Sequence, residues 1–233
     1  MSAKKIIFIT GTDTGVGKTL LTALLLHHLR ESGCHALAMK PFCSGGRDDV
    51  RLLQSLQRGE LSDAEMNPFF FSQPVAPFAA LQKNHRDIRL SEVIKHIDNI
   101  GEKCDCLLIE GSGGLMVPLG KRYTVGDLIF RLDARIIVVA RNQLGTINHT
   151  LLTINALRAN GAKNKNLAVA LMSVKKPDAS STSNRQIIEE YLSPIPVLCI
   201  PFLGSSASRT EIVKSAHKKV KTFLKKLLKS ANS

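Results

Sequence analysis

The sequence predicts an α/β fold in which a parallel β-sheet is flanked by helices on both faces. Short apolar runs alternate along the chain with amphipathic stretches of helical periodicity. Because these runs are almost continuously apolar, they are typical of strands buried on both faces. The 233 residues, 44% of them hydrophobic, suffice for one domain with its own core. We therefore expect a single domain over residues 1–233.

The predicted strands are short runs rich in Val, Ile and Leu, which favour buried strands. They lie at residues 6–10, 36–40, 104–110, 135–140, 167–173 and 197–200. The predicted helices have apolar residues three and four positions apart. They lie at residues 18–32, 48–57, 91–100, 148–160 and 185–192, and a basic C-terminal helix lies within about 209–233. Between residues 60 and 82, Pro68, Pro74 and Pro77 exclude a long helix, so we expect irregular structure there.

The first predicted strand runs directly into a glycine-rich segment, Gly11-Thr-Asp-Thr-Gly-Val-Gly-Lys-Thr19. Glycines allow backbone N–H groups to turn toward phosphate oxygens, and the following helix presents its positive N-terminus to the same anion. Lys18 can contact the terminal phosphates, and the Thr19 hydroxyl can reach a magnesium ion. Five residues separate Gly11 from Gly17, where the common P-loop has four. The segment predicts a nucleotide-binding site of the P-loop NTPase type.

Further polar residues follow the ends of other predicted strands, where parallel α/β sheets bind their ligands. Glu110 ends the strand at 104–110, and an acid at this place is typical of a carboxylate that coordinates magnesium or orders water. Lys40 ends the strand at 36–40 and, with Ser44 beyond it, offers a second cation for developing negative charge. The alternatives are a carboxylate that caps a turn and a surface lysine.

Of three further features, Asp49 and Asp13 each leave two interpretations open. Asp49 lies in the first turn of a predicted helix, so it could cap that helix or bind a metal. Asp13 could form the turn of the glycine-rich loop or lie near magnesium. The segment Leu144-Gly-Thr-Ile-Asn-His149 follows the strand at 135–140 and offers N–H groups at a helix start to an anion. We interpret His149 as a structural or exposed histidine rather than a catalyst.

The net charge of +13 is concentrated at one end of the chain. Residues 209–233 hold eight lysines or arginines and one acid, which leaves the rest only moderately basic, as suits a protein that binds anionic nucleotides. Apolar residues recur among these lysines at helical spacing. We expect this helix to pack on the body of the protein with a solvated basic face, contact with nucleic acid or membrane being the alternative.

Cysteine spacing and hydropathy exclude several classes of protein. The five cysteines form no Cys-x-x-Cys pair, which argues against a zinc site and against a disulfide framework. No apolar run approaches the ~20 residues of a membrane-spanning helix. The first residues lead straight into a strand and leave no room for a signal peptide. We therefore expect a cytoplasmic protein.

Five motifs, read together, resemble those of a known enzyme family. They occur in the family's order over residues 6–202. They are Gly11-Thr-Asp-Thr-Gly-Val-Gly-Lys-Thr19, Lys40-Pro-x-x-Ser44-Gly, Asn67-Pro-x-x-Phe71-x-x-Pro-x-x-Pro77, Glu110-Gly-x-Gly-Gly-x-x-x-Pro118-Leu and Leu144-Gly-Thr-Ile-Asn-His149. The chain resembles the dethiobiotin synthetases in this combination, and the extra P-loop residue is itself a feature of that family.

The resemblance implies a ligase of biotin biosynthesis, with Mg²⁺ as cofactor and ATP as co-substrate. The other substrates would be 7,8-diaminopelargonic acid and CO₂ or bicarbonate. One amine would form a carbamate, ATP would phosphorylate it, and the second amine would close the ureido ring, giving dethiobiotin, ADP and phosphate. The family's active form is a homodimer, and neither nucleic acid nor membrane is an expected partner.

The resemblance also implies roles for individual residues. Lys18, Lys40 and Thr14 match catalytic positions, and the magnesium-binding positions are Thr19, Asp49 and Glu110. The nucleotide-binding positions are Thr12, Asp13, Thr14, Gly15, Val16, Gly17, Lys18, Thr19, Glu110, Gly113, Ser173, Pro201, Phe202 and Leu203. The substrate-binding positions are Ser44, Leu144, Gly145, Thr146, Ile147 and Asn148, the last five acting across the dimer interface. Ser173 stands where family members often have an asparagine that reads the base.

Two other functions stay open from the sequence. One is a related P-loop amide-forming synthetase, and the other is a partitioning ATPase that binds DNA through its basic tail. Partitioning ATPases carry an additional lysine five residues before Lys18, where this chain has Asp13. Because strand-end surface lysines add little to stability, we expect Lys18→Ala and Lys40→Ala to reduce turnover far more than they disturb folding.

Overall fold

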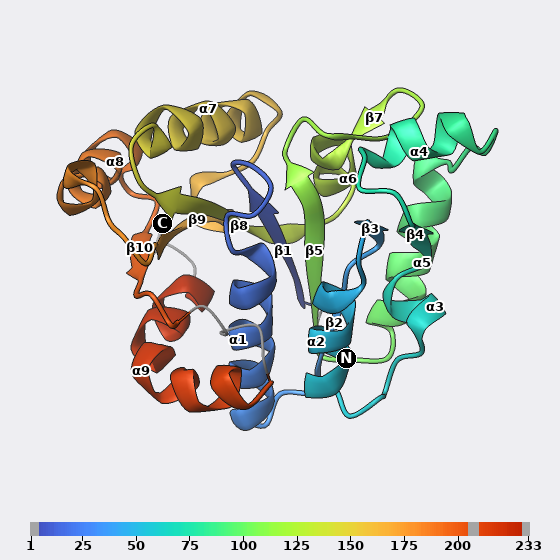
Figure 1. The fold of residues 1–233 in the computed structure, drawn as a ribbon, viewed down its shortest axis with the longest axis horizontal. Helices are drawn as coiled ribbons and strands as arrows, with labels where there is room; N and C mark the ends of the chain where they lie inside the picture. Colours follow the sequence, from blue (N-terminus) through green and yellow to red (C-terminus); the bar gives the residue numbers. More distant parts are fainter. Residues whose placement is uncertain (1–4, 205–209, 230–233) are drawn as a thin grey trace.

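A six-stranded parallel sheet forms the centre of the protein in a computed structural model that describes residues 5–204 and 210–229 (Figure 1). The strand order is β10-β9-β8-β1-β5-β2. Their bounds are β1 Lys5–Gly11, β2 Ala36–Met39, β5 Cys106–Gly114, β8 Ala134–Asn142, β9 Leu167–Ser173 and β10 Val197–Ile200. These strands are almost entirely buried, as their continuous apolar character predicts. The predicted fold class is confirmed.

Helices cover both faces of this sheet (Figure 1). On one face α1 (Lys18–Glu31) packs beside α9 (Thr210–Leu228), with α2 (Asp48–Leu56) next to both. The other face carries α5 (Leu90–Gly101), α6 (Val125–Phe130), α7 (Thr146–Ala159) and α8 (Asn184–Leu192). The C-terminal helix therefore packs on the body, as expected. Residues 209 and 230–233 of its predicted range lie outside the described residues.

Several boundaries differ from prediction for local reasons. Strand β5 continues four residues past Glu110, because its glycine segment runs alongside the P-loop and pairs Gly114 with Gly11. Helix α7 begins at Thr146 rather than residue 148, because Gly145 takes up a left-handed φ of 92° that starts the helix.

The region at residues 60–82 is more regular than predicted. It holds α3 (Asp63–Met66), β4 (Phe69–Phe71) and α4 (Pro77–Lys83), and β4 pairs in parallel with β3 (Phe42–Ser44). Ser62 and Glu65 form a capping box at the start of α3. Pro77 occupies the first turn of α4, where a proline's missing N–H costs nothing. The prolines exclude a long helix but permit these short elements.

A short β-hairpin was also not predicted from the sequence. It consists of β6 (Pro118–Gly120) and β7 (Tyr123–Thr124), which pair antiparallel and lead into α6. Thr124 and Asp127 cap α6 reciprocally, a signal that is visible in the sequence. No helix in the described ranges combines the length and apolarity that crossing a membrane demands.

Candidate active site

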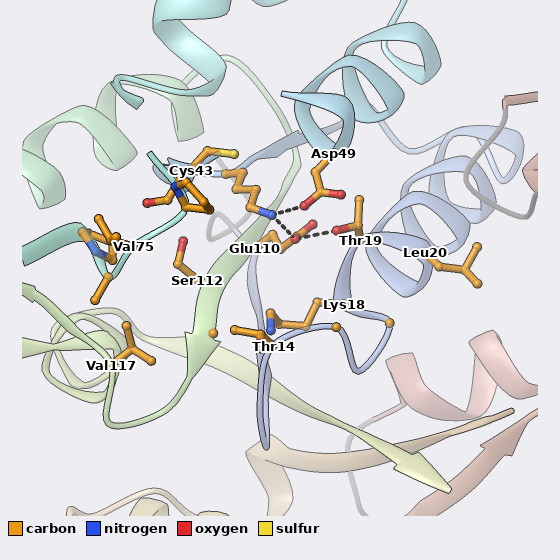
Figure 2. Close-up of a pocket in the computed structure, with 18 residues that line it drawn as sticks. Thr14, Lys18, Thr19, Leu20, Cys43, Asp49, Val75, Glu110, Ser112 and Val117 are labelled. Carbon is orange, nitrogen blue, oxygen red and sulfur yellow. Dashed lines mark hydrogen bonds and ion pairs between the residues drawn. The ribbon is translucent and has the colours of Figure 1, made fainter. Parts of the chain in front are cut away.

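The glycine-rich loop connects the carboxyl end of β1 to α1 (Figure 2). Gly15 and Gly17 have φ angles of 65° and 102°, in the left-handed region that favours glycine. The Thr12 N–H donates to a β8 carbonyl at 2.9 Å, which ties the loop to the sheet. The Asp13 carboxylate accepts the backbone N–H of Thr14 at 2.6 Å. This contact lies within the turn of the loop.

Lys18 is buried against this loop and is not a surface side chain. Its exposed fraction is 7%, and its Nζ donates to the Asp13 carbonyl at 2.8 Å. Burial lowers the pKa of Lys18 to about 8, Lys40 acts in the same direction, and Glu110 opposes the shift. An anionic phosphate oxygen is a stronger acceptor for this ammonium than a peptide carbonyl. The side chain is therefore suited to a polyanionic ligand in the loop.

Lys40 joins the two predicted carboxylates into one cluster. Its Nζ donates to Glu110 Oε1 at 2.8 Å and also contacts Asp49 Oδ2. Glu110, 1% exposed, accepts the Thr19 hydroxyl at 2.8 Å through the same oxygen. Figure 2 shows these contacts as dashed lines. Burial alone would lower the pKa of Lys40, but the two carboxylates raise it above its ordinary value, so the side chain stays charged.

The oxygen atoms around Lys40 fit a magnesium ion. Thr19, Asp49 and Glu110 provide a hydroxyl and two carboxylates, the hard oxygen ligands that Mg²⁺ prefers. Glu110 Oε2 is buried and has no hydrogen-bond partner within the described residues. A buried carboxylate oxygen without a donor is costly unless something binds it. These three residues, which the sequence singled out separately, lie together in the fold.

The glycines after Glu110 allow β5 to approach the P-loop. A Cβ atom on Gly114 would lie 3.2 Å from the Thr12 carbonyl oxygen. Gly113 has a φ of 65°, and a Cβ there would lie 2.7 Å from Val117. At the other side of the contact, a Cβ on Gly11 would meet the buried Val16 at 2.9 Å. Larger residues would push the strand end and the loop apart.

A cavity of about 620 Å³ lies in front of these residues. Ser44 lines it, and its buried Oγ has no hydrogen-bond partner in the described part of the chain, so this hydroxyl is available to a ligand. The remaining lining residues were not assigned to the site from sequence. They are Leu20, Cys43, Pro74, Val75, Ala76, Pro77, Ser112 and Val117. The proline motif at residues 67–77, which we used only for the resemblance, was the available signal for this wall.

The predicted substrate loop lies elsewhere on the protomer. Leu144, Gly145, Thr146, Ile147 and Asn148 form the turn after β8 and the first turn of α7, and none of them lines the cavity. The Leu144 side chain is 80% exposed. The segment at 178–184 holds the turn, with the Asp178 carboxylate accepting the Leu144 N–H at 2.8 Å. One protomer alone does not bring this loop to the P-loop cavity.

The residues expected to bind the base also lie outside the cavity. Ser173 ends β9, and its neighbour Met172 packs on Gly17, where a Cβ would lie 3.0 Å from the methionine Cγ. Pro201, Phe202 and Leu203 follow β10, and Phe202 is 43% exposed. The end of β9 is thus in contact with the P-loop, whereas these four residues do not line the cavity in the described part of the chain.

One contact of the P-loop was not predicted from sequence. Arg141, the penultimate residue of β8, donates from Nη2 to the Gly15 carbonyl at 2.5 Å. This contact fixes the tip of the loop to the neighbouring strand. A strand-end arginine carries no distinctive spacing, so only the fold reveals the contact.

Comparison with known proteins gives the chain a family. A protein-family model described as "AAA domain" matches residues 5–209. The ATP-dependent dethiobiotin synthetase of Bacillus licheniformis is 36% identical over 210 residues, covering 88% of both chains. The enzyme of the same name from Bacillus subtilis is 35% identical, covering 89% of both. That from Aquifex aeolicus is 38% identical over 187 residues, covering 79% of this chain and 83% of that protein.

Solved structures share the fold at lower identity. The septum site-determining protein MinD of Pyrococcus horikoshii, solved with Mg-ADP, aligns with a TM-score of 0.59 and 17% identity over 96% of this chain and 94% of its own. A ParA family ATPase from Chlorobium tepidum aligns with a TM-score of 0.55 and 16% identity over 97% and 95%. At this identity the likeness concerns the fold alone. The sequence relatives are far closer, and the chain belongs to the ATP-dependent dethiobiotin synthetase family.

Proposed function

We propose that the protein makes dethiobiotin from 7,8-diaminopelargonic acid, CO₂ and ATP. The observation that carries this proposal is the cluster beside the P-loop in which Lys40 pairs with Asp49 and Glu110, and Glu110 also accepts the Thr19 hydroxyl. A P-loop alone would support any nucleotide-dependent reaction. A second buried cation at the same place serves a reaction in which a second anion must approach the triphosphate.

The proposed reaction needs no covalent bond to the enzyme. The lone pair of one substrate amine forms a C–N bond with CO₂, and the amine loses a proton to give a carbamate. A carbamate oxygen attacks the γ-phosphorus, and the bond to the ADP oxygen breaks. The second amine then attacks the carbonyl carbon of the mixed anhydride, loses a proton and expels phosphate. The products are dethiobiotin, ADP and phosphate.

The two lysines stabilise negative charge on the reacting groups. A carbamate and a triphosphate repel each other, and further negative charge develops as the phosphoryl group is transferred. Lys18 and Lys40 lie in one cavity and remain positively charged at neutral pH, so both offer donors to these oxygens. Such electrostatic stabilisation is worth about 3–4 kcal/mol per group. Thr14 and the backbone of the P-loop position the phosphates, and the free Ser44 hydroxyl contacts the substrate.

Magnesium is the proposed cofactor. Thr19, Asp49 and Glu110 would hold it, and it would supply charge neutralisation for the phosphate oxygens. The support for this assignment is the all-oxygen donor set and the unpartnered Glu110 Oε2.

The finer parts of the proposal concern residues outside the cavity. We propose a homodimer in which the turn Leu144–Asn148 of one protomer holds the substrate carboxylate of the other; the 80% exposure of Leu144 supports a partner there. Ser173 and residues 201–203 would contact the nucleotide base. We further propose one synthetase domain over residues 1–233, located in the cytoplasm, whose reaction requires neither nucleic acid nor membrane.

The test is a coupled assay on the purified protein. Diaminopelargonate, bicarbonate, ATP and magnesium are supplied, and ADP and dethiobiotin are both measured. We expect equal amounts of the two products. Lys40→Gln should remove turnover, whereas Lys95→Gln, which removes an exposed lysine of α5 away from the cavity, should retain it. ADP release without dethiobiotin would refute the proposal.

The same assay separates the alternatives. A related amide-forming synthetase would prefer another diamine in competition with diaminopelargonate. A partitioning ATPase would hydrolyse ATP without any diamine. Asp13 at the position of that class's extra lysine argues against it.

A further inference from the structure

Helix α9 uses only one side for packing. Val213, Val220, Leu224 and Leu227 are completely buried against α1 and the sheet. The helix also contains six lysines and one acid, Glu211, and Lys229 follows directly. All seven lysines are exposed. The proposed reaction uses none of them.

Five of these lysines form one row, which we call the lysine stripe. It consists of Lys214, Lys218, Lys221, Lys225 and Lys229. Their spacings of four, three, four and four residues place them on the same side of a helix. At 1.5 Å per residue the stripe is about 22 Å long. Lys219 and Lys226, seven residues apart, lie on the other side of the buried face of α9 from the stripe.

The stripe is not neutralised by its surroundings. No ion pair between a carboxylate and any of these lysines is found in the described ranges. The stripe lies on the α1 side of α9, since Lys214 lines one groove with His27, Arg30 and Glu31 of α1. This polar groove of about 630 Å³ continues from Lys214, and its lining includes Arg30 and Arg58 as well as the acidic Glu31. The result is a row of exposed lysines with a groove of mixed charge at one end.

This surface lies away from the candidate active site. The carbonyl oxygen of Leu227 accepts Arg135 Nε at 2.8 Å, and Arg135 lies at the start of β8. The P-loop follows the carboxyl end of β1, which is parallel to β8. The C-terminal end of α9 therefore lies near the amino ends of the strands, at the opposite end of the sheet from the P-loop (Figure 1). A ligand on the stripe would leave the cavity open.

We propose that the lysine stripe binds the phosphodiester backbone of double-stranded DNA without regard to sequence. A straight row of cations complements a regular row of phosphates. The exposed large apolar residues of the described chain lie outside α1 and α9, so nothing on this surface would insert into a membrane. Nor does it expose an aromatic ring on which unpaired bases could stack. The proposal departs from our expectation of no nucleic-acid partner and is independent of the synthetase reaction.

The expected binding is electrostatic and strongly dependent on salt. If all five stripe lysines contact phosphates, the logarithm of the association constant should fall with the logarithm of salt concentration at a slope of about −4.5. Removing three lysines should reduce the steepness of this slope by about 3.

The experiment measures fluorescence anisotropy of a short labelled DNA duplex with the full-length protein, between about 50 and 200 mM salt. The test variant is Lys218→Gln/Lys221→Gln/Lys225→Gln. One control changes the other flank, Lys219→Gln/Lys226→Gln, and a second keeps the charge, with arginine at the three stripe positions. We expect the test variant to bind more than tenfold more weakly at about 100 mM salt and both controls to bind within about threefold of wild type. Turnover should be unchanged in all of them.

Several results would overturn the proposal. These are equal binding by the test variant and wild type, an equal loss in the flank control, or absence of binding to DNA. A second arm uses vesicles of phosphatidylcholine and phosphatidylglycerol; stripe-dependent binding to vesicles that is tighter than binding to DNA assigns the surface to membranes instead. A third measurement uses the wild-type protein alone and compares lysine acetylation with and without the duplex. The proposal requires the duplex to protect Lys218, Lys221 and Lys225 from acetylation more than Lys219 and Lys226.

Discussion

Replacing Lys40 should destabilise the fold as well as abolish turnover. The sequence suggested a surface lysine with little effect on stability, but Lys40 is 7% exposed and pairs with Glu110, which is 1% exposed. Lys40→Ala leaves that carboxylate buried with only the Thr19 hydroxyl as donor. Removing one member of a buried ion pair costs about 3–5 kcal/mol. In a protein of this size that corresponds to a decrease in Tm of about 10 °C.

Lys18 provides the contrast that tests this reasoning. Its ammonium is buried without a contacting carboxylate, and burial lowers its pKa to about 8. Because the folded state disfavours this charge, Lys18→Ala should leave stability unchanged or raise it while turnover is lost. Urea unfolding of both variants at neutral pH, with Lys40→Ala/Glu110→Gln as a rescue, measures the difference. Equal losses for Lys18→Ala and Lys40→Ala, or no regain in the double variant, would refute the reasoning.

Three further outcomes are expected. Burial lowers the pKa of His28 and His217, whose Nδ1 and Nε2 atoms are 2.9 Å apart, so the fold favours the neutral form of both rings. The stability of the fold is therefore full above about pH 6.5 and declines as the pH falls. Urea unfolding should show a shallower decline with pH for His217→Gln than for wild type. Gly114→Ala should weaken nucleotide binding at least tenfold by calorimetry, since its Cβ would crowd the Thr12 carbonyl; unchanged affinity would contradict the proposed contact between β5 and the P-loop. Chelation of magnesium should remove turnover and lower Tm only slightly, because Lys40 still pairs with Asp49 and Glu110 and only Glu110 Oε2 is left without a partner; global unfolding on chelation would contradict this.

Elements with strong local signals could be predicted from sequence. The strands at 167–173 and 197–200 have the predicted bounds, because polar or proline residues at the ends of these apolar runs leave little choice of where each strand ends. Elements whose bounds depend on a distant partner could not. The extension of β5 past Glu110 requires the P-loop beside it, and β3 and β4 are too short to be recognised without each other.

The same distinction applies to the site. Strand-end positions correctly indicated that Lys40 and Glu110 would lie near the P-loop, because parallel strands present their carboxyl ends at one edge. Their burial could not be predicted, since it depends on contacts between distant segments, in which Lys40 pairs with Glu110 and Glu110 accepts the Thr19 hydroxyl. Only the expectation about stability treated Lys18 and Lys40 as surface lysines, whereas each is 7% exposed. The contact of Arg141 with Gly15 depends on strand order alone, which no local pattern encodes.

The charges of the cavity explain how one site can hold two lysines close together. Lys18 and Lys40 contribute two positive charges, and Asp49 and Glu110 contribute two negative ones. The cavity is therefore neutral overall, which reduces the cost of burying each charge. Lys40 pairs with both carboxylates, whereas Lys18 contacts only a carbonyl group. Lys18 therefore has no anionic hydrogen-bond partner among the described residues, and a triphosphate bound in the loop would provide one.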